Sequence, residues 1–327
     1  MINNTKIVVI TPVRNEAWIL KAYLTATSLW ADEIIIADQM STDGSRDIYK
    51  LFPKVTVIDN MLPEMNQSAT RRLLFDEVKK IKEDVILFAL DADEFLSGDF
   101  LYSNDWRKII ESKKDDCFEW RWMNLCADRK KYTTHIPYFW ALHVSDDLWN
   151  GPYSDTAIHE WRLPWSPNAD ESHQYSVTDF YSIHFARVNV IRQKNKERFY
   201  QVSSVGDKRY NFVNIYHQYH SDENLAVYDV PENIYATYEK AGIDVVSMID
   251  FEDEGKHYTD EVIKNFNKYG IEKFAWLDIW DESWCKRNNI KKPQKWYHKL
   301  FLKYMNFSNK HRNVFTRGID KLLKLCI

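Results

Sequence analysis

The sequence has little of what makes a chain flexible or membrane-embedded. It holds only 8 Gly and 9 Pro among 327 residues, and no apolar run approaches the roughly 20 residues that span a bilayer. The first apolar stretch is short, ends at Pro12 and follows no basic segment, so it does not resemble a secretory signal. These absences argue against a disordered chain and a membrane-spanning protein, and we expect a cytoplasmic location.

Cysteine is also scarce, with 4 residues and no C-x-x-C pair. Cys117 and Cys126 fall in what the alternation predicts to be one strand, on opposite faces, so no bridge between them is expected. Free thiols in a reducing compartment are the simpler interpretation.

Aromatic residues, by contrast, are abundant, with 13 Trp and 19 Tyr. Together with 45% hydrophobic content they predict a substantial packed core. The densest region is 118–165, with 11 Phe, Trp and Tyr among 48 residues. These rings either pack the core or offer a stacking platform to an acceptor sugar, and both interpretations stay open.

Charge is divided unevenly along the chain. The net charge is −4, but residues 286–327 hold 12 Lys and Arg against one acid, which leaves −15 for residues 1–285. The tail 291–327 places apolar side chains at helical spacing among these basic residues. It is either a basic amphipathic helix on an anionic membrane surface or a helix packed on the rest of the protein. Nucleic acid is not expected as a partner, because the body is acidic and holds no recognised module.

Strand and helix patterns alternate through the first 90 residues. Buried strands are predicted at 6–11, 33–38, 55–59 and 84–90, with helices near 16–30, 41–52 and 66–82 between them. This order predicts an α/β fold with a mostly parallel sheet flanked by helices. Ligands of such sheets bind beyond the carboxyl ends of the strands, and a polar cluster follows each of the four strands.

Three carboxylates, Asp91, Asp93 and Glu94, come directly after the fourth strand. Two Asp residues one apart project to the same side, and both stay ionised only beside a cation. Oxygen ligands suit Mg²⁺ or Mn²⁺, which are commonly shared with substrate phosphates. The alternative is that these acids cap a helix or lie solvated on a loop.

At this point the sequence resembles the family 2 glycosyltransferases, which have the Rossmann-like GT-A fold and bind nucleotide-sugars. The matching segments are ITPVRNE (10–16), IIIADQMSTDGS (34–45), NQSATRR (66–72) and ALDADEFL (89–96). The resemblance implies an inverting, metal-dependent sugar transfer in which a carboxylate acts as the general base. Each segment is short, but their order and spacing together are characteristic of that family.

The resemblance also implies roles for particular residues. It places Thr11, Pro12 and Glu16 beside the base and ribose, with Asp38 accepting a hydrogen bond from the base. Gln39 departs from the second Asp of many relatives, and Arg72 stands where many have Asn. The remaining implied contacts are with the diphosphate (Arg71), with the ribose or a metal-bound water (Asp91), and with Mn²⁺ or Mg²⁺ (Asp93).

Two later segments extend this hypothesis. Glu160, in the segment IHEW, is the candidate general base, with Asp155 in reserve, because relatives carry a His-Glu pair in this region. The alternative is that Glu160 forms a salt bridge at the end of a strand. His184 is a candidate third metal ligand, and the alternative is a core histidine with its hydrogen bonds satisfied.

The expected organisation is a GT-A catalytic domain at 1–220, followed by a helical region with a basic tail at 221–327. Within the catalytic domain, residues 1–100 would bind the nucleotide-sugar, for which a UDP-sugar is favoured, and residues 101–220 would bind the acceptor. The acceptor is expected to be a saccharide or lipid-linked saccharide of surface polysaccharide or lipopolysaccharide synthesis, with the enzyme cytoplasmic or peripheral on the inner membrane face. The alternatives are a sugar nucleotidyltransferase, which the Gly-free segment TPVRNE disfavours, and a carbohydrate-binding protein without catalysis.

Overall fold

A computed structural model describes residues 5–62, 65–150, 162–164, 170–207, 210–221 and 225–326. The chain divides by packing into two compact units. Unit 1 is Met1–Val188 with Ala226–Glu252, and unit 2 is Asn189–Leu225 with Asp253–Ile327. This division follows packing, whereas the predicted boundary after residue 220 was placed where the sequence pattern becomes helical, and it stays a prediction.

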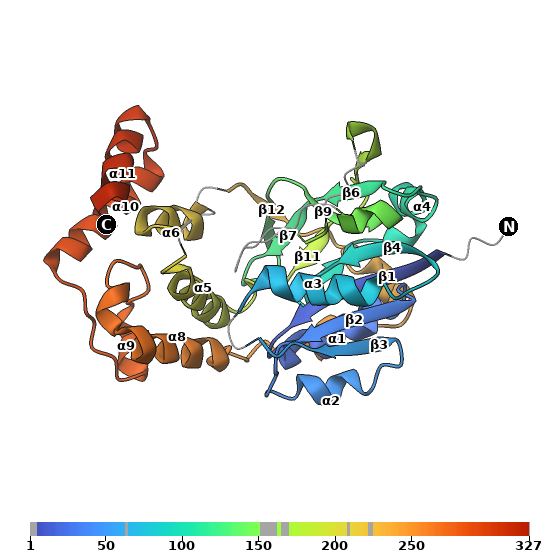
Figure 1. Cartoon of the computed structure of the whole chain (residues 1–327), viewed down its shortest axis with the longest axis horizontal. Helices are drawn as coiled ribbons and strands as arrows, with labels where there is room; N and C mark the ends of the chain where they lie inside the picture. Colours follow the sequence, from blue (N-terminus) through green and yellow to red (C-terminus); the bar gives the residue numbers. More distant parts are fainter. Residues whose placement is uncertain are drawn as a thin grey trace. The chain divides into compact units, whose positions relative to one another are not determined.

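Unit 1 is built on a seven-stranded sheet with strand order β10-β6-β9-β4-β1-β2-β3 (Figure 1). Strands β3, β2, β1 and β4 run parallel, and β9 is antiparallel to both of its neighbours. The strands are β1 (Thr5–Val13), β2 (Glu33–Asp38), β3 (Val55–Asp59), β4 (Asp84–Ala89), β6 (Cys117–Trp120), β9 (Tyr138–His143) and β10 (Gln174–Ser176).

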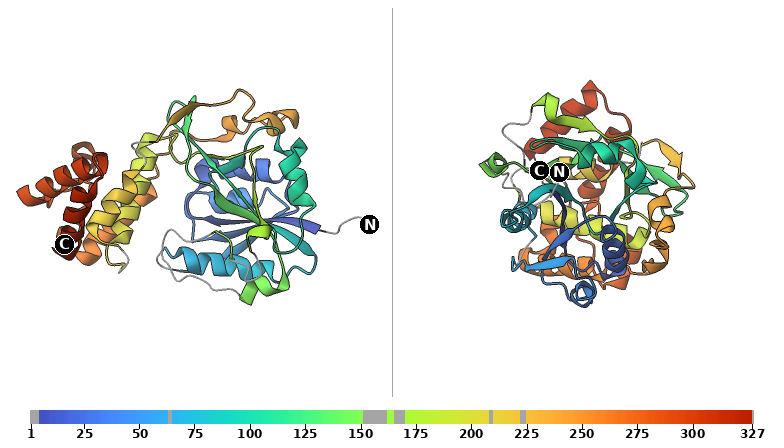
Figure 2. Two further views of the ribbon diagram at one scale, coloured as in Figure 1. Left: turned by 90° about the horizontal axis from the view of Figure 1, so that it is seen from above. Right: turned by 90° about the vertical axis from the view of Figure 1, so that its right-hand side faces the viewer.

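Helices cover both faces of this sheet because its central strands are apolar on both sides. On one face Val9, Ile36 and Phe88 pack against α1 (Ala17–Thr27). On the other, Ile10 and Leu87 belong to the core that includes Leu74 and Phe75 of α3 (Gln67–Val78). Figures 1 and 2 show the sheet between these helices. The predicted α/β, Rossmann-like class is therefore confirmed, and the arrangement is consistent with the GT-A fold.

The other helices of unit 1 are short. They are α2 (Ser45–Tyr49), α4 (Asn104–Ile110) and α7 (Ala236–Lys240), with 3₁₀ turns at η1 (Phe100–Tyr102), η2 (Asp146–Asn150), η3 (Glu171–His173) and η5 (Val246–Met248).

A second, five-stranded sheet in unit 1 has the order β12-β8-β7-β11-β5. Its strands are β5 (Glu94–Leu96), β7 (Trp122–Leu125), β8 (Lys131–Thr133), β11 (Ser182–His184) and β12 (Val227–Asp229). The predicted single strand through Cys117 and Cys126 was wrong, because the chain leaves the first sheet at Trp120 and enters the second at Trp122. All four cysteines are free, as expected.

Unit 2 is helical. Its elements are α5 (Val190–Ser204), α6 (Phe212–Tyr219), α8 (Lys256–Tyr269), η6 (Ile271–Phe274), α9 (Glu282–Arg287), α10 (Trp296–Lys310) and α11 (Val314–Cys326). Phe301 and Met305 of α10 form a core with Val213 and Tyr216 of α6. Across the described residues, no helix combines the length and apolar character needed to cross a bilayer.

Candidate functional site

The loops that follow β1 and β2 are tied together by side chains that bond to backbone amides. Asn15 Oδ1 accepts from Thr42 N at 2.7 Å, and Ser41 Oγ accepts from Asn15 N at 2.9 Å. Asp43 Oδ2 accepts from Ala17 N at 2.8 Å. The polar residues of these two segments therefore hold the strand-end loops at one edge of the sheet, as expected for parallel strands.

Asp38, at the end of β2, is completely buried. Its Oδ1 accepts from Arg46 Nη1 at 2.8 Å and Ser41 N at 3.0 Å, and its Oδ2 accepts from Tyr49 Oη at 2.7 Å. These three donors give the carboxylate a structural function in positioning the loop after β2. The predicted contact between Asp38 and a nucleotide base stays a prediction.

Three further predicted residues lie along the end of β1. The Thr11 hydroxyl is buried and lies 2.5 Å from the Tyr23 hydroxyl, so this side chain points into the core. Pro12 is half-buried. Half-buried Glu16 accepts a hydrogen bond from Trp18 Nε1 at 2.5 Å. Pro12 and Glu16 are the two that present partly accessible surface beside the strand end.

Glu94, whose role the sequence left open, is the buried centre of the acidic cluster. Its Oε1 accepts from Trp122 Nε1 at 2.8 Å and Arg162 Nη2 at 2.8 Å. Its Oε2 accepts from Arg162 Nη1 at 2.7 Å and from the backbone N of Asp91 at 2.7 Å. The pairing with Arg162 is bidentate, which is the strongest arrangement for these two groups.

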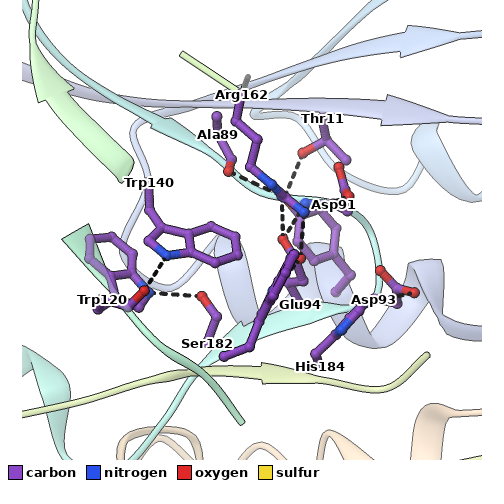
Figure 3. A network of polar contacts seen from close by, with 12 residues as sticks. Thr11, Ala89, Asp91, Asp93, Glu94, Trp120, Trp140, Arg162, Ser182 and His184 are labelled. Atoms are coloured by element: carbon purple, nitrogen blue, oxygen red, sulfur yellow. Dashed lines mark hydrogen bonds and ion pairs between the residues drawn. The ribbon is translucent and has the colours of Figure 1, made fainter. Parts of the chain in front are cut away.

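Arg162 reaches this cluster from far along the chain and was missed by sequence reasoning. Its Nη2 also donates to Asp91 Oδ2 at 2.8 Å, and its guanidinium lies 4.5 Å from the ring centre of Trp140. Figure 3 shows the side chain directed between Asp91 and Glu94. One feature of the sequence could have revealed such a partner. Glu94 is a third carboxylate with no basic residue nearby in the sequence, and a buried carboxylate needs a cation beside it.

Burial and charge act in opposite directions within this pair. Burial raises the pKa of Glu94 above its ordinary value, and the positive charge of Arg162 offsets part of that rise. For Arg162, burial alone would lower the pKa, but Asp91 and Glu94 outweigh it and raise the pKa. Arg162 therefore remains charged, and its removal would leave Glu94 with a strong tendency to take up a proton.

Arg71 of α3 supplies the second buried guanidinium. Its Nη2 donates to Asp91 Oδ1 at 3.1 Å. Its Nη1 is buried and has no hydrogen-bond partner among the described residues. A buried charged donor left unsatisfied in this way is uncommon in proteins and requires an explanation.

Asp93 and His184 face each other at the opposite side of the acidic turn. Asp93 Oδ2 lies 3.6 Å from His184 Nε2, while His184 Nδ1 donates to Asn124 Oδ1 at 2.7 Å. The register explains the meeting, because His184 of β11 is opposite both Glu94 of β5 and Asn124 of β7. With the proton on Nδ1, Nε2 presents its lone pair toward Asp93, which is the tautomer that binding a metal through Nε2 requires.

The imidazole of His184 is packed against neighbouring side chains, and its Nε2 faces Asp93 as a metal ligand would. Its ring stacks on Trp122, with ring centres 5.2 Å apart and planes inclined by 15°. Figure 3 shows the imidazole directed at Asp93.

The side chains of Asp93, Glu94 and His184 bring potential ligand atoms within 4.8 Å of one another. Glu94 is a poor ligand, since both of its oxygens already accept from Arg162. Asp93 and His184 fit a divalent cation, and an imidazole nitrogen among the donors suits Mn²⁺ better than Mg²⁺.

The structure changes the electrostatic argument for that cation. Three carboxylates meet two buried guanidinium groups, Arg71 and Arg162, so one negative charge is in excess. Asp91 and Asp93 were expected to stay ionised only beside a cation, and for Asp91 the structure supplies that cation as arginine. The case for a metal now rests on the pairing of Asp93 with His184.

The catalytic candidates Glu160 and Asp155 lie outside the residues that the structure describes. Of the tryptophans offered as a sugar platform, Trp120 and Trp140 are fully buried and stacked on each other, so they belong to the core. Trp122 is half-buried between His184 and the guanidinium of Arg162.

No protein-family model and no curated protein sequence matches the chain. A solved structure that resembles part of it is glucosyl-3-phosphoglycerate synthase from Mycobacterium tuberculosis, in complex with Mn²⁺, UDP and glucosyl-3-phosphoglycerate. The similarity has 20% identity and a TM-score of 0.22, and it covers 28% of this chain. The matched part spans about a third (34%) of that protein's chain. A match of this size carries no argument about function, which must come from the site itself.

Proposed function

We propose that the chain is a glycosyltransferase that moves a sugar from a nucleotide-sugar, a UDP-sugar in the first instance, to a saccharide or lipid-linked saccharide acceptor. The proposal assigns it to surface polysaccharide or lipopolysaccharide synthesis. The observation that carries it is Nη1 of Arg71, which has no hydrogen-bond partner among the described residues and lies beside Asp91, on the same acidic turn as the Asp93–His184 pair. An anion-binding donor next to a cation site at the carboxyl ends of parallel strands suits a diphosphate.

Arg71 would donate to the diphosphate and stabilise the negative charge that grows as the nucleoside diphosphate leaves. Asp93 and His184 would hold Mn²⁺ or Mg²⁺, and such a cation, when bound, supplies Lewis-acid neutralisation of that leaving group. Arg162 would hold Asp91 and Glu94 in place, so that the turn carrying Asp93 is fixed before the donor binds.

The acceptor hydroxyl must lose its proton as it attacks the anomeric carbon from the face opposite the leaving group. A carboxylate is suited to take that proton, and inversion at the anomeric carbon follows from the direction of attack. Glu160 is the proposed base, with Asp155 in reserve.

The donor assignment is tested by thermal stabilisation with UDP-, GDP-, CMP- and dTDP-sugars, each with and without Mn²⁺. We expect at least one nucleotide-sugar to raise the unfolding temperature in a Mn²⁺-dependent manner. Arg71→Met should weaken that ligand by on the order of tenfold to a hundredfold, because a charge-assisted hydrogen bond to phosphate is lost. Arg72→Met, one position along α3, is the matched control. Stabilisation by none of the four, or equal losses in both variants, would refute the diphosphate site.

The general base is tested by Glu160→Gln. This variant should keep donor binding and lose sugar transfer by on the order of a hundredfold to ten-thousandfold, since general-base catalysis contributes about that much. Initial rates of transfer measure the loss, and thermal stabilisation by the donor measures binding. Unchanged transfer, with loss in Asp155→Asn instead, would move the role to Asp155.

A further inference from the structure

Helices α10 and α11 form a hairpin in unit 2 that is held together by polar contacts. Asp320 of α11 is buried, and its carboxylate accepts from Tyr304 Oη at 2.9 Å and Ser308 Oγ at 3.1 Å. His217 Nε2 of α6 lies 2.9 Å from the same group. Thr316, one turn earlier on α11, is also buried. The inward side of α11 thus carries a hydroxyl and a carboxylate group beside the apolar side chain of Leu323.

Leu323 of α11 packs against the core formed by α6 and α10, but most of the large apolar residues of α11 point the other way. Val314 and Leu325 are 87% and 85% exposed, and Phe315 and Leu322 are 75% and 64% exposed. At 100° per residue these four side chains fall on the side of the helix opposite Thr316 and Asp320. Helix α11 therefore buries polar groups and exposes four large apolar side chains, whereas an ordinary surface helix turns its apolar face toward the protein.

Helix α10 adds a second exposed apolar stripe. Trp296 is 75% exposed, and Leu300 and Phe307 are more than half exposed, whereas Phe301 and Met305 on the other side are buried. The spacing of Trp296, Leu300 and Phe307 places them on one side of the helix. Together the two helices expose seven large apolar side chains, which is more than scattered surface residues account for.

The charges around these stripes are of one sign. The hairpin carries seven exposed basic side chains: Lys299, Lys303, Lys310, Arg312, Arg317, Lys321 and Lys324. Its one acid, Asp320, is buried and used internally. Among the described residues none of the seven pairs with a carboxylate, so their charge is not neutralised within the chain. The partner surface must therefore be both negatively charged and able to accept apolar side chains.

We propose that the α10–α11 hairpin binds the surface of an anionic lipid bilayer. The exposed aromatic and aliphatic side chains would enter the boundary between headgroups and acyl chains, while the flanking Lys and Arg meet lipid phosphates. Charge complementarity favours this occupant over a second copy that meets the hairpin through its own hairpin, since the two basic faces would repel each other. The inference goes beyond sugar transfer and depends on neither the donor site nor its chemistry.

The test is flotation of the full-length protein with vesicles of phosphatidylcholine and phosphatidylglycerol in equal parts, compared with vesicles of phosphatidylcholine alone. We expect binding to the anionic vesicles only, and weaker binding as salt is raised. The double variant Phe315→Ser with Leu322→Ser should bind on the order of a hundredfold more weakly, since each buried apolar side chain contributes about tenfold. Both positions are exposed, so the unfolding temperature should not change.

Leu51→Ser is the matched control, because Leu51 is an exposed leucine in unit 1, far along the chain from the hairpin. It should bind like the wild type. No binding to the anionic vesicles, or equal binding by the double variant, would overturn the proposal. So would wild-type self-association that the double variant abolishes, because the exposed face would then be a contact between copies.

Discussion

Replacing Asp93 by Asn is expected to lower sugar transfer by on the order of a thousandfold while leaving the protein folded. The change removes the carboxylate that faces His184 Nε2 across 3.6 Å, and with it one of the two proposed ligands of the divalent cation. Without the cation, the charge of the leaving diphosphate is met by Arg71 alone, and electrostatic stabilisation of this kind commonly accounts for several powers of ten in rate.

Initial rates measure the loss of transfer, and electron paramagnetic resonance of Mn²⁺ measures binding of the cation directly. Asp76→Asn serves as the control, because Asp76 is an exposed carboxylate of α3 that pairs with Lys79. It should match the wild type in both measurements. If Asp93→Asn binds Mn²⁺ with unchanged affinity, the assignment of the cation to Asp93 and His184 is wrong.

The second large effect is on stability. Arg162→Met should lower the free energy of unfolding by about 3–5 kcal/mol, because it leaves the buried carboxylate of Glu94 without its bidentate partner. The double variant Arg162→Met with Glu94→Gln should recover at least about 1 kcal/mol of this loss, since it removes the uncompensated charge. Denaturant unfolding of the wild type, Arg162→Met, Glu94→Gln and the double variant gives the coupling energy between the two side chains. Additive losses would show that the two groups do not act as a pair.

The loss in Arg162→Met should also depend on pH in a defined direction. Without Arg162, burial holds the pKa of Glu94 further above the 4.5 of an ordinary glutamate. A carboxyl group with a raised folded-state pKa destabilises the protein as the pH rises above the unfolded-state pKa. The deficit relative to wild type should therefore be largest near neutral pH and shrink toward pH 4.5. A deficit that is constant with pH would mean that lost packing, not charge, is responsible.

The strands and helices of the first 90 residues could be predicted closely because their signals are local. The predicted strands at 33–38 and 55–59 coincide with β2 and β3, and the helix predicted at 66–82 is α3 with a shorter end. A strand that is a short apolar run bounded by turn residues can be assigned without information from the rest of the chain. The later region was less predictable, since its strands pair across long separations in two different sheets.

Contacts between residues far apart in the sequence also limited the prediction of the site. Asp93 and His184 were predicted from the sequence as ligands of one cation, and the register of β5 and β11 brings these two side chains close together. Sequence reasoning missed Arg162, which is 68 positions from Glu94, and Asn124, which sets the His184 tautomer from 60 positions away. The sequence also did not reveal that the carboxylate of Asp38 accepts from Arg46 and Tyr49 in the next helix, whereas its predicted contact with a base stays a prediction. A charged residue type alone does not reveal whether its partner will be a ligand or another side chain.

The central claim is that a divalent cation and a nucleoside diphosphate occupy adjoining parts of one site. Isothermal titration calorimetry of UDP into the wild-type protein, with and without saturating Mn²⁺, measures this directly as a coupling between the two ligands. We predict that Mn²⁺ tightens UDP binding by on the order of tenfold or more, and that the coupling disappears in Asp93→Asn. Equal UDP affinity with and without Mn²⁺ in the wild type would contradict the account.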